Sequence, residues 1–189
     1  MKQSSDKSRF KNICNVSRET FNLLSKYEEI LKKKNNEFNL IGKSTLPIIW
    51  TRHFADSLKL EATLELLILN YKKKIKICDV GSGAGFPGMI LSILAKSNNW
   101  NTSITLIESN RKKADFLKKL ANSLGLQINI INDRAENLGE AFDIITARAM
   151  ANLKDLLFIC SKLKHKKSKF VLIKGKKWEE EVNCKIQEK

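Results

Sequence analysis

The segment Ile75–Val80 is an apolar, β-rich run that leads directly into a glycine-rich turn. The turn contains Gly81, Gly83 and Gly85, and residues 86–88 then begin a predicted helix. Glycine reaches backbone conformations that other residues avoid, and it lets the backbone come close to a bound molecule. Because the first N–H groups of a helix have no partner within the helix, they can donate to the polar end of a ligand. This stretch predicts a strand, a turn and a helix with a ligand site at the turn.

After this unit, β-rich runs and helical segments alternate along the chain. Further strands are predicted at residues 103–108, 127–131, 141–147 and 168–174, and helices at residues 88–96, 111–124 and 152–164. Such alternation is typical of right-handed strand–helix–strand crossovers, which build a parallel sheet covered by helices on both faces. We therefore expect an α/β, Rossmann-like sheet whose ligand lies at the carboxyl ends of the strands.

The first 70 residues have a different pattern. Residues 17–34 carry apolar side chains at three-to-four-residue spacing, as on one face of a helix, and a second helix is predicted from Pro47 to Leu58. A chain of 189 residues can bury one sizeable core but is short for two independent domains. We expect residues 1–70 to form an N-terminal helical cap on a catalytic core of residues 71–189, within one integrated domain.

Acidic residues follow or end three successive predicted strands. Asp79 lies beside the glycine turn, Glu108 ends the second strand, and Glu136 follows the third. A carboxylate beside the turn would repel a pyrophosphate, but it can pair with the ammonium group of S-adenosylmethionine. Glu108 can accept hydrogen bonds from both ribose hydroxyls, and polar groups of residues 133–136 lie where an adenine edge fits. Together these residues predict S-adenosylmethionine as the cofactor.

A dinucleotide cofactor is the alternative. Gly83, Gly85 and Gly88 match the G-x-G-x-x-G pattern of dinucleotide-binding folds, and Glu108 follows on the next strand. In those folds the first glycine comes directly after the strand, whereas here that place belongs to Gly81. The register favours S-adenosylmethionine, and a dinucleotide-dependent oxidoreductase stays open as the second interpretation.

The chain is strongly basic, with a formal net charge of +15. Such an excess favours an acidic partner, and nucleic acid is the commonest one. A biased genome that is rich in lysine gives the same composition, so charge alone leaves both explanations open.

Other functional classes find little support in the composition. No apolar run reaches the roughly 18 to 20 residues that span a bilayer, so we expect a cytoplasmic protein. Cys14, Cys78, Cys160 and Cys184 form no C-x-x-C pair, so we expect reduced thiols and no metal site. We further expect a monomer.

Three motifs occur together in the sequence. Residues 79–88 are DVGSGAGFPG, residues 50–58 are WTRHFADSL, and residues 146–149 are TARA. With these motifs the chain resembles the RsmG family, the bacterial small-subunit (16S) ribosomal RNA guanine-N7 methyltransferases, also called glucose-inhibited division protein B. The resemblance covers residues 21–175 and implies an S-adenosylmethionine cofactor and a ribosomal RNA or small-subunit substrate. It also implies cofactor contacts at Gly81, Phe86, Ala135, Glu136 and Arg148.

Basic residues of these motifs are candidates for RNA contact. Arg52 and His53 lie within one predicted helical turn of Asp56, so the three can share a face near the pocket mouth. We expect Arg52 and His53 to position or bind RNA, and Lys174 and Lys176, after the fifth strand, to hold RNA phosphates. A structural role for His53 and a solvated loop for the two lysines stay open. Because N7 of guanine bears an unprotonated lone pair, no general base is needed and no catalytic residue is assigned.

The C-terminal segment departs from the usual methyltransferase pattern. Methyltransferases of this fold usually add two strands after the fifth, whereas residues 178–189 are charged and show no strand pattern. We therefore expect the C-terminal strands to be missing, which would expose an edge of the sheet. A non-catalytic RNA-binding relative is the third interpretation.

Overall fold

Five parallel strands form one sheet in the structure, a computed structural model that describes residues 5–69, 71–148 and 152–173. The strands are β1 (Ile75–Val80), β2 (Thr102–Ile107), β3 (Asn129–Ile131), β4 (Phe142–Arg148) and β5 (Lys164–Ile173). Their order is β3-β2-β1-β4-β5, and every neighbouring pair is parallel. The predicted α/β, Rossmann-like sheet is confirmed.

Two strands begin two or more residues away from their predicted starts, while the other strand boundaries agree to within one residue. β3 begins two residues later than expected, since pairing with β2 starts only at Asn129. β5 begins at Lys164, four residues before its predicted start, and the predicted helix 152–164 ends at Ser161 instead. The lysine-rich start of β5 has no strand pattern of its own. It becomes a strand because β4 supplies backbone partners, as in the pairing of Phe142 with Lys164.

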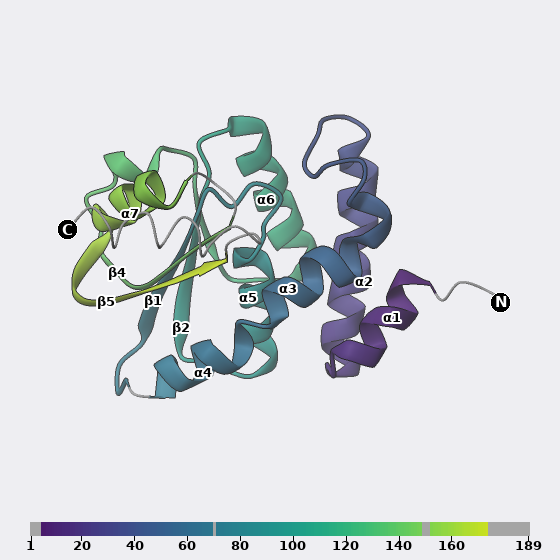
Figure 1. The fold of residues 1–189 in the computed structure, drawn as a ribbon, viewed down its shortest axis with the longest axis horizontal. Helices are drawn as coiled ribbons and strands as arrows, with labels where there is room; N and C mark the ends of the chain where they lie inside the picture. Colours follow the sequence, from purple (N-terminus) through teal and green to yellow (C-terminus); the bar gives the residue numbers. More distant parts are fainter. Residues whose placement is uncertain (1–4, 70, 149–151, 174–189) are drawn as a thin grey trace, which may run out of the picture.

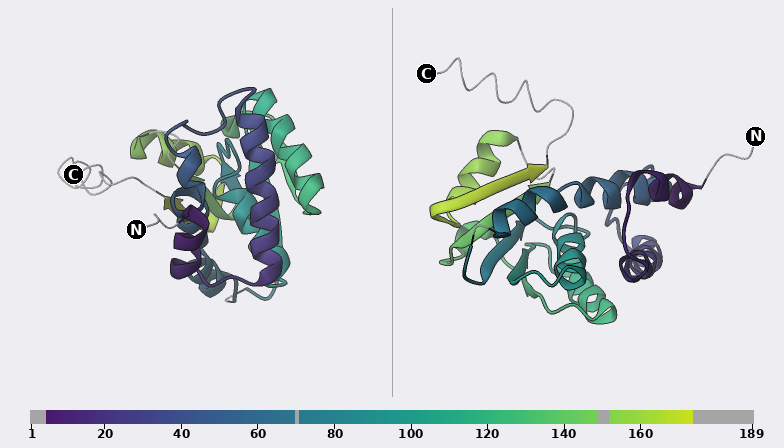
Figure 2. Two further views of the ribbon diagram at one scale, coloured as in Figure 1. Left: turned by 90° about the vertical axis from the view of Figure 1, so that its right-hand side faces the viewer. Right: turned by 90° about the horizontal axis from the view of Figure 1, so that it is seen from below.

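Helices cover both faces of the sheet. Alternate side chains of a strand point to opposite faces. Ile75 and Ile77 of β1 face the larger core, with α5 (Gly88–Ser97) and α6 (Arg111–Leu124). Cys78 and Val80 face a smaller core with α7 (Leu153–Ser161). Figures 1 and 2 show α7 on one side of the sheet and α5 and α6 on the other.

The N-terminal helices lie on the α5 and α6 side of the sheet (Figure 1). They are α1 (Asp6–Ile13), α2 (Arg18–Asn35), a 3-10 turn η1 (Leu46–Ile48), a π-helical turn η2 (Trp50–Phe54), α3 (Ala55–Leu58) and α4 (Glu61–Leu69). Among them, α2 contacts both α5 and α6, and α3 contacts α5. The helix predicted from Pro47 to Leu58 is thus a succession of three short helical pieces. None of the helices in the described part of the chain is long and apolar enough to cross a membrane.

The sequence did not predict α1 and α4. Tertiary contacts hold α1: Asp6 accepts hydrogen bonds from the Trp50 backbone N–H at 2.8 Å and from Thr51 Oγ1 at 2.6 Å. The apolar residues of α4 lie all round the helix, and among them only Leu64 is buried. A periodic apolar face was therefore absent from the sequence of α4.

Candidate cofactor site

The carboxyl ends of β1, β2 and β4 lie side by side. Val80 pairs with Ile107 of β2 and with Ala147 of β4. The next residues along each segment, Gly81, Glu108 and Arg148, therefore meet at one edge of the sheet. Ligands of open parallel sheets bind at this edge.

The glycines of the turn have two different surroundings. Gly81, Gly83 and Gly85 all have positive φ, at 63°, 57° and 102°. Gly81 and Gly83 are partly exposed, and the nearest neighbour of a Cβ built on Gly83 would be 3.8 Å away. A Cβ on the buried Gly85 would lie only 2.6 Å from Tyr27 Oη and 2.9 Å from Met89 Cβ. Gly83 thus leaves room for a ligand, whereas Gly85 lets α2 and α5 pack against the turn.

The carboxylate of Glu108 fastens the turn to the end of β2. Its Oε2 accepts a hydrogen bond from the Gly83 N–H at 2.8 Å, and its Oε1 accepts one from the Asn110 N–H at 2.8 Å. Each carboxylate oxygen has a further lone pair, so Glu108 can still accept a hydrogen bond from a ligand hydroxyl. Two backbone donors therefore hold the predicted ribose acceptor in place.

Asp79 is buried, and its carboxylate binds within the fold. Its Oδ2 accepts a hydrogen bond from the Gly88 N–H at 3.1 Å, and its Oδ1 accepts one from Thr146 Oγ1 at 2.9 Å. Burial raises the pKa of Asp79 to about 6, while its hydrogen bonds and the charge of Arg148 act in the opposite direction. Asp79 thus joins β1 to α5 and β4, a structural role that the sequence did not predict. Its contact with the cofactor ammonium stays a prediction.

A polar hollow of about 470 Å³ lies beside Glu108, at the ends of β2 and β3. Its lining comprises Ser109, Asn110, Asn132, Asp133, Arg134 and Asn137. Next to it, Ala135 is buried in the same core as Val80 and Ile107, and Glu136 is exposed. The hollow lies in the region where the sequence predicted an adenine edge.

Phe86, which follows the turn, belongs to a cluster built from distant parts of the chain. Its ring stacks on that of His53, with centroids 4.9 Å apart, and on that of Tyr27, with centroids 5.4 Å apart. The guanidinium carbon of Arg148 lies 4.9 Å from the centre of the Phe86 ring. Arg148 Nη2 also donates a hydrogen bond to His53 Nδ1 at 2.8 Å. We call His53, Phe86 and Arg148 the His–Phe–Arg cluster.

These contacts fix the state of His53. A guanidinium can only donate, so Nδ1 of His53 accepts from Arg148, and Nε2 carries the proton and donates to Thr45 Oγ1 at 3.0 Å. Burial lowers the pKa of His53 to about 4, and the charges of Arg148 and Arg52 add to this effect. His53 is therefore neutral near pH 7 and has a partner at each ring nitrogen.

The prediction that Arg52, His53 and Asp56 share one face is wrong for His53. Arg52 is exposed, and its Nη1 lies 3.5 Å from Asp56 Oδ2, so these two residues do share a face. His53 is buried because η2 packs its ring against Phe86. The other predicted RNA-binding residues, Lys174 and Lys176, lie outside the described residues.

The cysteines behave as apolar core residues where they are described. Cys78 of β1 and Cys160 of α7 are free thiols buried in the smaller core, and burial raises the pKa of Cys78 and brings that of Cys160 to about 11. Cys14 is half-buried, and Cys184 lies outside the described residues. In the described ranges, no group of three or more His, Cys, Asp or Glu side chains could hold a metal ion.

Three residues that support the site were missed in the sequence. Tyr27 donates a hydrogen bond to the Ala84 carbonyl at 2.5 Å, Thr45 binds His53, and Thr146 binds Asp79. Tyr27 stood out only as one apolar position on a helix, and the two threonines matched no pattern. Contacts across the fold reveal all three.

The residues at this edge fit S-adenosylmethionine. The open Gly83 backbone leaves space for a ligand, Glu108 can accept hydrogen bonds from hydroxyl groups, and Arg148 offers a cation to a carboxylate. The fit rests on the chemistry of these groups and on the space beside the turn.

Comparison with known proteins identifies related sequences. The model of the GidB family, described as rRNA small subunit methyltransferase G, matches residues 20–189. The ribosomal RNA small subunit methyltransferase G of Orientia tsutsugamushi (strain Ikeda) is 42% identical over 170 residues, which are 89% of this chain and 79% of that protein. The protein of the same name from Zymomonas mobilis is 39% identical, over 85% of this chain and 72% of that protein.

Solved structures show the same fold at low sequence identity. A mutant of MtNAS in complex with S-adenosylmethionine has a TM-score of 0.51 and 16% identity, over 79% of this chain and 58% of that chain. MtNAS in complex with MTA and tNA has a TM-score of 0.50 and 17% identity, over 79% of this chain and 53% of that chain.

Proposed function

Because this chain belongs to the GidB family, rRNA small subunit methyltransferase G, we propose that it transfers the methyl group of S-adenosylmethionine to N7 of a guanine in small-subunit (16S) ribosomal RNA. The observation that carries this proposal is the carboxyl edge of the sheet. There the open glycine turn, the fixed carboxylate of Glu108 and the oriented guanidinium of Arg148 meet. The net charge of +15 is consistent with an RNA substrate.

We assign the cofactor to residues of this edge. The proposed set is Asp79, Gly81, Gly83, Gly85, Phe86, Glu108, Ala135, Glu136 and Arg148. In it, Glu108 accepts from the ribose hydroxyls, and Arg148 pairs with the amino-acid carboxylate. Gly85 and the buried Asp79 act mainly by shaping the turn. When bound, the cofactor supplies a methyl group on a positively charged sulfur.

The protein's contribution to the reaction is positioning. N7 of guanine has a free lone pair, so the attack needs no proton acceptor, and alignment of the reacting atoms supplies the rate. The state of His53 supports this mechanism, because a neutral imidazole with both nitrogens engaged is poorly suited to act as a general base. We propose that His53 orients Arg148 and Phe86, and that the exposed Arg52 contacts the RNA.

Transfer of labelled methyl from S-adenosylmethionine tests the function. The substrates are unmethylated 16S RNA and small subunits, and the modified base is mapped afterwards. Label on N7 of one guanine is the expected result. RNA binding without transfer to either substrate would favour the non-catalytic interpretation.

A second experiment tests the attacking atom. When 7-deazaguanine replaces the mapped guanine, methyl transfer should stop while RNA affinity stays nearly the same, because only N7 has been replaced by carbon. Methylation of the 7-deaza substrate would reject the N7 assignment but would leave the methyltransferase assignment in place.

A further inference from the structure

The first half of β5 departs from regular strand pairing. Phe142 pairs with Lys164 and Ile144 pairs with Lys169. Two steps along β4, from 142 to 144, therefore stand opposite five steps along β5, from 164 to 169. The extra residues form a bulge, and bulges of this kind redirect side chains and are frequent near functional sites.

Specific hydrogen bonds hold this bulge in shape. Ser168 Oγ donates to the Phe142 carbonyl at 2.5 Å and accepts from the His165 N–H at 2.8 Å. His165 Nδ1 accepts from the Lys167 N–H at 3.1 Å, so its Nε2 carries a proton and donates to Asp143 Oδ1 at 3.0 Å. The His165 side chain, which had no evident role in the sequence, therefore braces the bulge against β4.

Asp143 connects the bulge to the start of β1. Its side chain is 3% exposed, and besides His165 it accepts from Lys73 Nζ and from the Lys76 N–H, each at 2.9 Å. Asp143 thus connects the bulge to the segment that leads into β1. These hydrogen bonds hold the backbone that carries the lysines of the bulge in one position.

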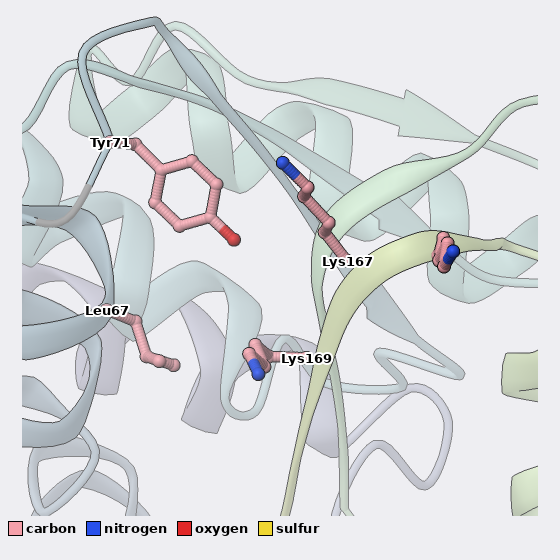
Figure 3. A pocket seen from close by; sticks show the side chains of 5 residues that line it. Leu67, Tyr71, Lys167 and Lys169 are labelled. Atoms are coloured by element: carbon pink, nitrogen blue, oxygen red, sulfur yellow. The ribbon is translucent and has the colours of Figure 1, made fainter.

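The bulge presents lysines to a hollow of about 500 Å³. Lys166, Lys167 and Lys169 come from β5, and Leu67 and Tyr71 come from α4 and the segment after it. Figure 3 shows Tyr71 and Leu67 on one side of this space and Lys167 and Lys169 of β5 across from them. We call these five residues the lysine hollow.

The charge of the lysine hollow is unbalanced. Its lining contains three lysines and no carboxylate, and in the described part of the chain none of the three lysines makes an ion pair. Lys72, which follows Tyr71 in the chain, is exposed as well. Like charges gathered without counter-charges favour an anionic ligand.

A second groove of the surface is better balanced. It lies between α2 and α6 and also contains lysines, but Glu37 and Asp115 line it as well, and Lys34 pairs with Glu37. The lysine hollow is therefore the stronger candidate for binding an anion.

We propose that the lysine hollow binds the phosphate backbone of the ribosomal RNA substrate. Lysines act there as point charges toward phosphates, and Tyr71 offers a hydroxyl donor and an aromatic ring. The inference rests on the RNA substrate of the proposed function and adds a contact surface that is separate from the cofactor edge.

The position of the hollow gives this contact a distinct role. It lies at the amino end of the sheet, while the glycine turn follows the carboxyl end of β1, which at about 3.3 Å per residue is about 20 Å long. β5 itself runs from the hollow to the carboxyl edge. An RNA segment that lies along β5 would therefore touch the hollow while its target base enters the site, so the hollow sets the orientation of the substrate.

A comparison of two lysine pairs tests this proposal. The test variant is Lys166→Ala with Lys167→Ala, and the matched control is Lys118→Ala with Lys119→Ala, an adjacent exposed pair on α6. Both variants lose the same charge. Affinity for a 16S RNA fragment is measured at several salt concentrations, and S-adenosylmethionine affinity and thermal unfolding are measured in parallel.

We expect the β5 variant to bind RNA more weakly and to show a log–log salt slope that is smaller by about 1.4, at about 0.7 per lost single-strand phosphate contact. Its cofactor affinity should equal that of the parent chain, and the α6 control should keep most of its RNA affinity and its slope. Lysine-to-arginine changes at positions 166 and 167 should preserve binding.

Unchanged RNA affinity in the β5 variant would overturn the proposal. Equal losses of RNA affinity in the β5 and α6 variants would overturn it too, because they would indicate an effect of net charge alone. Methyl transfer is recorded separately. A parent chain that binds RNA through the hollow but transfers no methyl group would reject the proposed reaction and support the hollow.

Discussion

His53 Nδ1 accepts a hydrogen bond from Arg148 Nη2 at 2.8 Å, and this bond joins the N-terminal helices to the end of β4. Arg148 is partly buried, and burial lowers the pKa of its guanidinium. The imidazole lone pair and the face of the Phe86 ring replace part of the water that the guanidinium has lost. The contact therefore fixes the direction of a cation at the proposed cofactor edge.

Replacement of His53 should slow methyl transfer through loss of positioning. In His53→Ala the Arg148 side chain loses its acceptor, and we expect the rate to fall by about tenfold to a hundredfold. His53→Asn, which keeps a side-chain acceptor, should recover part of the loss. Rates are measured from pH 6 to 9, and both variants should keep the pH profile of the parent. Loss of a titration near pH 6.5 on mutation would identify His53 as a general base instead.

His53 should also make the stability of the fold depend on pH. Its pKa is about 4 in the folded chain against 6.5 for an ordinary histidine, so between these values the unfolded chain binds more protons. Stability from this group is present above pH 6.5 and is lost as the pH falls toward 4. The parent should therefore lose more of its free energy of unfolding than His53→Asn between pH 7 and pH 4.5, as measured by urea unfolding. If the difference in free energy of unfolding between the two chains stayed constant over this pH range, burial would not lower the pKa of His53.

Asp79 should stabilise the fold through its two internal hydrogen bonds. Asp79→Ala leaves the Gly88 N–H without its partner, and we expect a loss of about 1 to 3 kcal/mol in the free energy of unfolding at pH 4, where Asp79 is protonated in the fold. Asp79→Asn keeps an acceptor and should lose less. The raised pKa of Asp79, about 6, favours the protonated form in the fold, so its stabilising effect is full below pH 3.8 and is lost as the pH rises through 6. Between pH 4 and pH 7 the free energy of unfolding of the parent should therefore fall relative to that of the Asn variant. Urea unfolding across this range measures both, and the same pH dependence in the two chains would refute the shifted pKa.

Gly83 and Gly85 should respond differently to alanine. A Cβ on Gly85 would lie within 3 Å of Tyr27 and Met89, so Gly85→Ala should lower the melting temperature strongly. A Cβ on Gly83 would meet no close neighbour, so only its left-handed backbone, which costs about 1 to 2 kcal/mol for other residues, opposes Gly83→Ala. We expect Gly83→Ala to weaken cofactor binding more than it lowers stability. Calorimetry measures cofactor affinity and thermal unfolding measures stability. Equal falls in melting temperature for the two variants would contradict the different roles proposed for Gly83 and Gly85.

Glu108→Gln should weaken cofactor binding. The amide group of Gln can accept through only one atom, whereas Glu108 accepts from both Gly83 and Asn110 and is proposed to accept from the ribose as well. A loss of about tenfold to a hundredfold in S-adenosylmethionine affinity is expected, as for hydrogen bonds to charged groups. Glu19→Gln, at an exposed position at the start of α2, serves as the control and should leave the affinity unchanged. Equal affinity of Glu108→Gln and the parent would remove Glu108 from the site.

The sequence by itself determined the sheet and the carboxyl edge at which we propose that the ligand binds. Periodic apolar patterns and the glycine turn are local properties of the chain, so they predicted β1, the alternating helices and the strand ends at Gly81, Glu108 and Arg148. Local sequence patterns failed to predict the secondary structure of segments that are held by contacts with neighbouring elements. The helix α4 lacked a periodic face, and the start of β5 became a strand only through pairing with β4.

Only the tertiary structure decided what the individual polar side chains do. Asp79 turned out to tie together three elements, and His53 turned inward to Arg148, a residue 95 positions away. His165, which stood among lysines without a pattern, braces the β5 bulge against Asp143. Hydrogen bonds act over about 3 Å in space whatever the separation in sequence, so their partners become definite only when the fold has brought distant segments together.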